Sequence, residues 1–131
     1  MKYLLDTNIL IYRLKNLGNV NGNFLKKQNE KMSISVITYG ELIFGAEKSK
    51  LREKNLEVAH EIRKIFPVEN ITSEIMECFG CLKANLQKTG KNVDDMDLLI
   101  AATAISNDMV LVTHNTKHFI NIPELQLEDW F

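Results

Sequence analysis

The chain has few of the residues on which a disulfide-stabilised or zinc-binding protein depends. Among its 131 residues there are two cysteines, Cys78 and Cys81, and two thiols at this spacing do not indicate a structural disulfide. The pair falls inside a predicted helix, whereas redox pairs usually occupy a helix N-terminus, so a thiol oxidoreductase is only a distant alternative. The three histidines are scattered and complete no zinc signature.

Long hydrophobic runs and a strong net charge are also missing. No apolar run approaches the ~20 residues needed to cross a bilayer, and the N-terminus has no secretory signal, so we expect a cytoplasmic protein without a membrane partner. Sixteen basic and seventeen acidic residues give a net charge of −1, which by itself does not indicate a nucleic-acid binder. Lys48, Lys50, Arg52 and Lys54 form a basic group, and such groups are usually solvated helix faces.

Short apolar segments alternate with segments of helical periodicity along the chain. Strands are predicted at residues 2–5, 32–37, 68–71 and 109–113. Helices are predicted at residues 9–14, 24–31, 38–46, 51–65, 72–88 and 97–106. The Gly- and Asn-rich segment 16–23 predicts a turn, and the tail ending in Trp130 and Phe131 is expected to form an edge strand. This alternation predicts an α/β fold of three layers, a central parallel sheet flanked by helices, in one domain over residues 1–131.

Three acidic residues stand where predicted elements meet. Asp6 ends the first strand, and Glu41 and Asp97 are predicted in the first turn of later helices. In open parallel sheets these positions gather beyond the carboxyl ends of the strands, where ligands bind. Carboxylate oxygens are the ligands that Mg²⁺ and Mn²⁺ prefer, so the sequence predicts a metal site at this edge.

Each acid also has a purely structural explanation. Asp6 is placed to cap the first helix, Glu41 completes a capping box with Thr38, and Asp94 with Asp97 resembles a helix start whose acids face the positive end of the helix dipole. Taken singly, the acids therefore indicate little. A site is favoured because three independent caps on one edge would be a coincidence.

The segments around these acids resemble the PIN-domain ribonucleases and, within them, the VapC toxins of toxin–antitoxin pairs. The similar segments are LLDTNILIY at 4–12, SVITYGELIFGAEKS at 35–49, DLLIAATAISNDMVLVTHN at 97–115, HF at 118–119 and LEDW at 127–130. The resemblance implies an endoribonuclease dependent on Mg²⁺ or Mn²⁺, with Asp6, Glu41 and Asp97 as catalytic residues and metal ligands. It further implies that Asn8 and Thr38 orient these acids.

The chain departs from this family at Asn115, where many members have a fourth acid. An amide oxygen still binds a metal ion or water but brings no charge, so we expect Asn115 to complete the metal shell without holding a permanent second ion. Asp94 and Asp95 are the alternatives, because either is close in sequence to the Asp97 helix.

The resemblance also implies partners: a cognate antitoxin that wraps the toxin and blocks its site, and a second copy of the chain in a homodimer. Leu42, Ile43 and Phe44 are consecutive and apolar, so at least one is expected to face outward as a partner surface; a helix buried on two sides is the alternative. We expect an RNA substrate to be hydrolysed by a metal-activated water; some members of the family cut tRNA, but the sequence does not select tRNA over mRNA or rRNA. The rim lysines Lys48, Lys50 and Lys117 would hold its backbone. The alternative function is a non-catalytic RNA- or protein-binding module with a degenerate acidic site.

Overall fold

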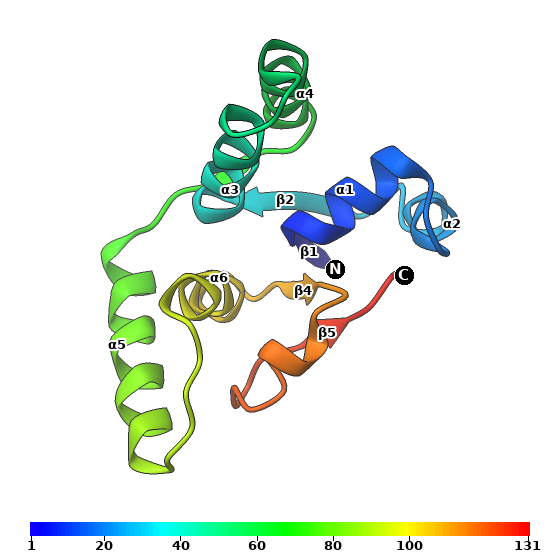
Figure 1. Cartoon of the computed structure of the whole chain (residues 1–131). Coiled ribbons are helices and arrows are strands. Elements are labelled where there is room, and N and C mark those ends of the chain that lie inside the picture. Colours follow the sequence, from blue (N-terminus) through cyan, green and yellow to red (C-terminus); the bar gives the residue numbers. More distant parts are fainter.

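A computed structural model describes all residues from Met1 to Phe131 and contains a five-stranded parallel sheet with strand order β3-β2-β1-β4-β5 (Figure 1). The strands are β1 (Lys2–Leu5), β2 (Lys31–Ser35), β3 (Val68–Glu69), β4 (Val110–Val112) and β5 (Leu127–Glu128). The helices are α1 (Thr7–Lys15), α2 (Val20–Lys26), α3 (Val36–Glu47), α4 (Arg52–Ile65), α5 (Ser73–Lys88), α6 (Asp95–Ser106) and the short 3-10 helix η1 (Thr116–His118). The predicted parallel α/β architecture is confirmed.

The three layers follow from the alternation of side chains along the two central strands. Leu4 of β1 and Leu111 of β4 belong to the core cluster beneath α5 and α6. Their neighbours on the strands, Tyr3, Leu5, Val110 and Val112, join the cluster beneath α1, α2 and α4. Because successive strand residues point to opposite faces, both faces of the sheet are buried against helices, as parallel sheets require.

Two helix predictions are wrong in their boundaries. The segment predicted as a helix over 24–31 ends at Lys26, and Lys31 already begins β2; α2 starts earlier, at Val20, inside the predicted turn 16–23. Val20 and Phe24 lie one helical turn apart and are both buried in the core with Trp130. Burial of this pair outweighs the low helix propensity of the surrounding Gly and Asn residues.

The start of α3 also differs from the prediction. The hydroxyl of Ser35 accepts a hydrogen bond from the Thr38 N–H at 3.0 Å, so Ser35 caps the helix. The Thr38–Glu41 capping box is therefore wrong, and Glu41 lies in the second turn of α3 rather than in the first.

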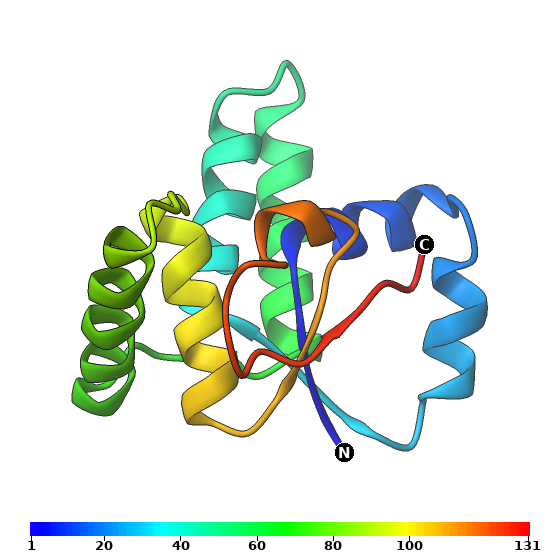
Figure 2. The same ribbon diagram turned by 90° about the horizontal axis from the view of Figure 1, so that it is seen from below.

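The helices pack in pairs around the sheet. Figures 1 and 2 show α3 and α4 as a hairpin that projects away from the sheet. They show α5 and α6 packed together as a second, separate pair. β5 is an edge strand, as expected for the tail, and Trp130 beyond it is buried. None of the helices combines the length and the apolar character that crossing a membrane requires.

Candidate active site

Asp6 lies between the end of β1 and the start of α1 and is held on both carboxylate oxygens. Oδ1 accepts the N–H of Thr7 at 2.9 Å, and Oδ2 accepts the hydroxyl of Thr113 at 2.9 Å. Asp6 therefore caps α1, as the structural explanation required, yet the residue is only 6% exposed. Burial raises the pKa of its carboxyl, and the two hydrogen bonds and the charge of His118 offset part of that rise.

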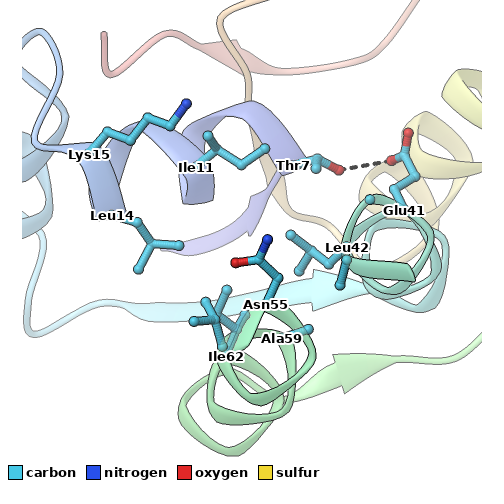
Figure 3. A pocket seen from close by; sticks show the side chains of 12 residues that line it. Thr7, Ile11, Leu14, Lys15, Glu41, Leu42, Asn55, Ala59 and Ile62 are labelled. Atoms are coloured by element: carbon cyan, nitrogen blue, oxygen red, sulfur yellow. Dashed lines mark hydrogen bonds between the residues drawn. The ribbon is translucent and has the colours of Figure 1, made fainter. Parts of the chain in front are cut away.

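Glu41 reaches the same region from α3. Its Oε1 accepts the hydroxyl of Thr7 at 2.9 Å, which ties α3 to the first residue of α1 (Figure 3). The pKa of Glu41 is raised by desolvation of the carboxyl, lowered in part by the Thr7 hydrogen bond, and raised again by the charges of Asp6 and Asp97. Glu41 thus lies within the electrostatic field of both other acids.

Asp97 lies in the first turn of α6, as predicted, with 24% of its side chain exposed. Burial raises the pKa of its carboxyl most, and the charge of Asp6 raises it further, while His118 lowers it. The Nδ1 atom of His118 is 3.5 Å from Asp97 Oδ2. Asp6, Glu41 and Asp97, here called the acidic rim, therefore come from three separate elements and repel one another across one end of the sheet.

The alternative fourth acids differ in what they contact. Asp94 caps α6 by accepting the Met96 N–H at 3.1 Å, and its charge raises the pKa of both Glu41 and Asp97. Asp95 forms an ion pair with Lys83 at 3.0 Å, so its carboxylate is engaged elsewhere. Of the two, Asp94 is the one whose charge reaches the acidic rim.

Asn115 lies between β4 and η1. Its N–H donates to the Thr113 hydroxyl at 3.1 Å, the same hydroxyl that donates to Asp6. Asn115 is exposed. Its backbone is linked to Asp6 of the acidic rim through the Thr113 hydroxyl.

The supporting residues are partly other than expected. Asn8 accepts the N–H of His114 at 3.1 Å and so fixes the loop after β4. The buried hydroxyl of Thr38 accepts from Ser35 at 3.2 Å and has no hydrogen bond to a rim acid. Thr7, Thr113 and His118 contact the acids directly, and the roles of the two threonines were not predicted from the sequence. Only the position of Thr113 at the end of a predicted strand was a usable signal.

The chemistry of the acidic rim suits a divalent cation. No three Asp, Glu, His or Cys side chains are arranged to hold a metal ion as they stand, but the rim supplies hard carboxylate oxygens that are desolvated and mutually repelling. Of the groups that act on the acids' pKa, only His118 contributes positive charge. A cation would relieve this repulsion by drawing the carboxylates toward it.

Comparison with known proteins places the whole chain in a family. The PIN domain family model matches residues 3–125. The tRNA(fMet)-specific endonuclease VapC of Shigella flexneri is 37% identical over 131 residues, covering 99% of this chain and 98% of the relative.

Solved structures agree with the sequence comparison. VapBC2 from Rickettsia felis bound to a DNA fragment from its promoter has a chain that is 33% identical, with a TM-score of 0.92 and complete coverage of both chains. DNA-bound VapBC from Salmonella typhimurium is 36% identical, with a TM-score of 0.91 and coverage of 100% of this chain and 99% of that one. PIN-domain ribonucleases generally depend on a divalent metal. The chain belongs to the PIN-domain family, among the VapC ribonucleases.

Proposed function

We propose that this chain is the toxin of a toxin–antitoxin pair and hydrolyses RNA phosphodiester bonds with the aid of Mg²⁺ or Mn²⁺. The observation that carries the proposal is the convergence of Asp6, which follows β1, with Glu41 of α3 and Asp97 of α6, the pKa of each carboxyl being raised by burial. Carboxyls whose pKa is raised by desolvation and by neighbouring acids are typical of functional sites. The VapC relatives, named as ribonucleases, support RNA as the substrate.

Each of these residues has a separate role in the proposed reaction. Asp6 and Asp97 are the principal ligands, Asn115 completes the shell, and Glu41 is a ligand or orients the attacking water, held in place by Thr7. A bound divalent cation lowers the pKa of water and neutralises charge on a phosphoryl group. Asp6 is positioned before any cation binds, because both of its oxygens already accept hydrogen bonds.

A tRNA is the first substrate to test, because two of the VapC relatives are named tRNA(fMet)-specific endonucleases. Lys48, Lys50 and Lys117 are exposed and are the candidates for holding the RNA backbone by phosphate contacts, which do not select sequence.

The antitoxin is proposed to dock in the apolar groove between α1, α3 and α4, a cavity of about 290 Å³ next to the acidic rim. Ile11, Leu14, Leu42 and Val58 line it, and the Thr7–Glu41 pair closes one end (Figure 3). A segment of the antitoxin bound in this groove would therefore contact Glu41 of the acidic rim, as expected of an inhibitor that blocks the site. The neighbours that are VapBC toxin–antitoxin complexes support such a partner.

Phe44 is proposed as a second partner contact, for the antitoxin or for another copy of the chain. Of the three consecutive apolar residues in α3, Leu42 and Ile43 are half-buried and Phe44 is 64% exposed. The expectation that one of them faces outward is therefore confirmed.

The deciding experiment measures cleavage of tRNA by the purified chain. Wild type should lose activity in EDTA and regain it with Mn²⁺, and Asp97→Asn should lose at least about a thousandfold because a metal ligand and a charge are removed. The matched control is Asp108→Asn, the same substitution just before β4, at the opposite end of the strand from Thr113; it should cleave normally. Undiminished cleavage in EDTA or by Asp97→Asn would refute the proposal, and a non-catalytic binding module would show no cleavage at all.

A further inference from the structure

Three aromatic rings from distant parts of the chain gather beside the acidic rim. Phe131 lies flat against the imidazole of His114, with ring centroids 4.2 Å apart and an interplanar angle of 25°. Tyr12 meets both rings edge-on, at centroid distances of 5.7 Å from His114 and 5.0 Å from Phe131. We call these three residues the ring stack.

The ring stack is attached rigidly to the acidic rim. His114 stands between Thr113, whose hydroxyl donates to Asp6 at 2.9 Å, and Asn115. Its N–H donates to the side chain of Asn8 at 3.1 Å, and its Nδ1 bonds to Asp129 Oδ2 at 2.9 Å. His114 is thus held both at its backbone and at its ring, next in sequence to the residue that supports Asp6.

Phe131 is supported from behind by the corner between α1 and α2, which Figure 2 shows beside the C-terminal end of the chain. A Cβ atom added at Gly18 would lie 2.6 Å from the Phe131 carbonyl oxygen and 3.0 Å from two ring carbons. Gly18 also has a φ of +58°, which favours glycine. The absence of a side chain at position 18 therefore lets Phe131 sit against this corner.

These contacts leave the imidazole partly open. Phe131 covers one face of His114 and Tyr12 contacts it edge-on, yet 38% of the His114 side chain remains exposed, and Phe131 is 40% exposed. Exposed stacked aromatics beside a nuclease site fit an unpaired nucleobase, since every base has a face that stacks. The carboxylate of Asp129 on the imidazole makes the same spot unfavourable for a phosphate.

We propose that the ring stack of Tyr12, His114 and Phe131 binds an unpaired base of the RNA next to the bond that is cut, with His114 presenting the stacking face. The proposal rests on the proposed ribonuclease function and deepens it. It makes His114 and Phe131 determinants of substrate binding, while the acids of the rim perform the hydrolysis.

The test uses the full chain carrying Asp97→Asn, so that RNA stays intact, and a short single-stranded RNA with 2-aminopurine placed at successive positions. One position should lose fluorescence on binding, because stacking quenches this base. Adding His114→Ala should restore the fluorescence and weaken binding about 5- to 100-fold, the range expected for one stacked base. Phe131→Leu, which keeps apolar contact with the α1–α2 corner but removes the ring, should act in the same direction.

Two further variants keep the result interpretable. His114→Phe loses the Asp129 hydrogen bond but keeps a ring, so it should retain most of the quenching. Leu25→Ala, at a residue 66% exposed on α2, should change neither the quenching nor the affinity for RNA. Unchanged quenching in His114→Ala, with or without weaker binding, would overturn the proposal even if tRNA is cleaved normally. If wild type neither cleaved nor bound RNA, the result would instead overturn the proposed ribonuclease function.

Discussion

The acidic rim and the apolar groove meet at the hydrogen bond between Thr7 and Glu41, and they differ in almost every other respect. The rim gathers like charges whose pKa values are raised by burial. The groove presents apolar side chains to solvent, among them Leu14, which is 59% exposed, and Ile11, which is 37% exposed.

Neither region is what stability alone would select. Clustered carboxylates oppose folding at neutral pH, and exposed apolar surface gains nothing until it is covered. The difference lies in what each region binds: the rim suits a cation and the groove suits another protein. Since Glu41 is the one rim acid that lines the groove, substitutions elsewhere should separate the two activities.

The largest separation is expected from Leu14→Asp. A charge in the groove should weaken binding of the antitoxin by about 30-fold or more, the effect of losing an interface hot spot. Leu14 is largely exposed, so the fold and RNA cleavage should be unaffected. Binding is measured by calorimetry with the cognate antitoxin.

The reciprocal variant, Asp97→Asn, should bind antitoxin normally and fail to cleave. If Leu14→Asp lost cleavage while remaining folded, or bound antitoxin as tightly as wild type, the proposed division between rim and groove would be wrong.

A smaller effect is expected when the support beneath the rim is removed. Thr113→Val keeps the shape of a fully buried side chain but deletes the hydroxyl that donates to Asp6 and accepts from Asn115. The free energy of unfolding should fall by about 1–3 kcal/mol, and cleavage should fall about tenfold or more because Asp6 is less well positioned.

Thr103→Val is the matched control for this change. Thr103 is also fully buried, but its hydroxyl donates to the Leu99 carbonyl within α6. Its cleavage rate should match wild type after chemical denaturation has confirmed folding. Equal losses of cleavage in both variants would show that the Thr113 hydroxyl has no particular role at the rim.

Removing one rim charge should stabilise the chain. Asp97→Asn relieves the burial and repulsion that raise the pKa of this carboxyl, so Tm without metal should rise by about 2–4 °C. Asp108→Asn should leave Tm within about 1 °C. Calorimetric melting checks both, and a lower Tm for Asp97→Asn would mean that the carboxylate stabilises the fold instead.

The smallest expected effect is the pH dependence of the higher Tm of Asp97→Asn. Because the folded-state pKa of Asp97 is raised above 3.8, its ionisation costs stability that is regained as the pH falls through the raised value. The Tm advantage of Asp97→Asn should therefore shrink on acidification and vanish below pH 3.8. An advantage that is constant across this range would show that charge is not its source.

Much of the rim was predictable because it depends on local patterns. The apolar run of β1 ends at Asp6, and α6 begins with a recognisable acidic turn that contains Asp97. Parallel strands then place both at one end of the sheet. The position of Glu41 was harder, because Ser35 was predicted inside a strand and the structure shows that it caps α3 in place of Thr38.

The contacts between segments could not be predicted from one sequence. Thr113 reaches Asp6 across 107 positions of the chain, and Thr7 reaches Glu41 across 34. The boundaries of α2 were wrong for a related reason, since they depend on packing of Val20 and Phe24 against Trp130. Periodicity identifies which residues are apolar but not the distant residue that each will contact.

The central claim is that Asp6, Glu41 and Asp97 share one divalent cation, and a calorimetric titration with Mn²⁺ tests it most directly. Wild type and Asp108→Asn should each bind Mn²⁺ at a specific site with the same affinity, and Asp97→Asn should lose that binding. Absence of a specific site in wild type, or equal binding by Asp97→Asn, would contradict the account.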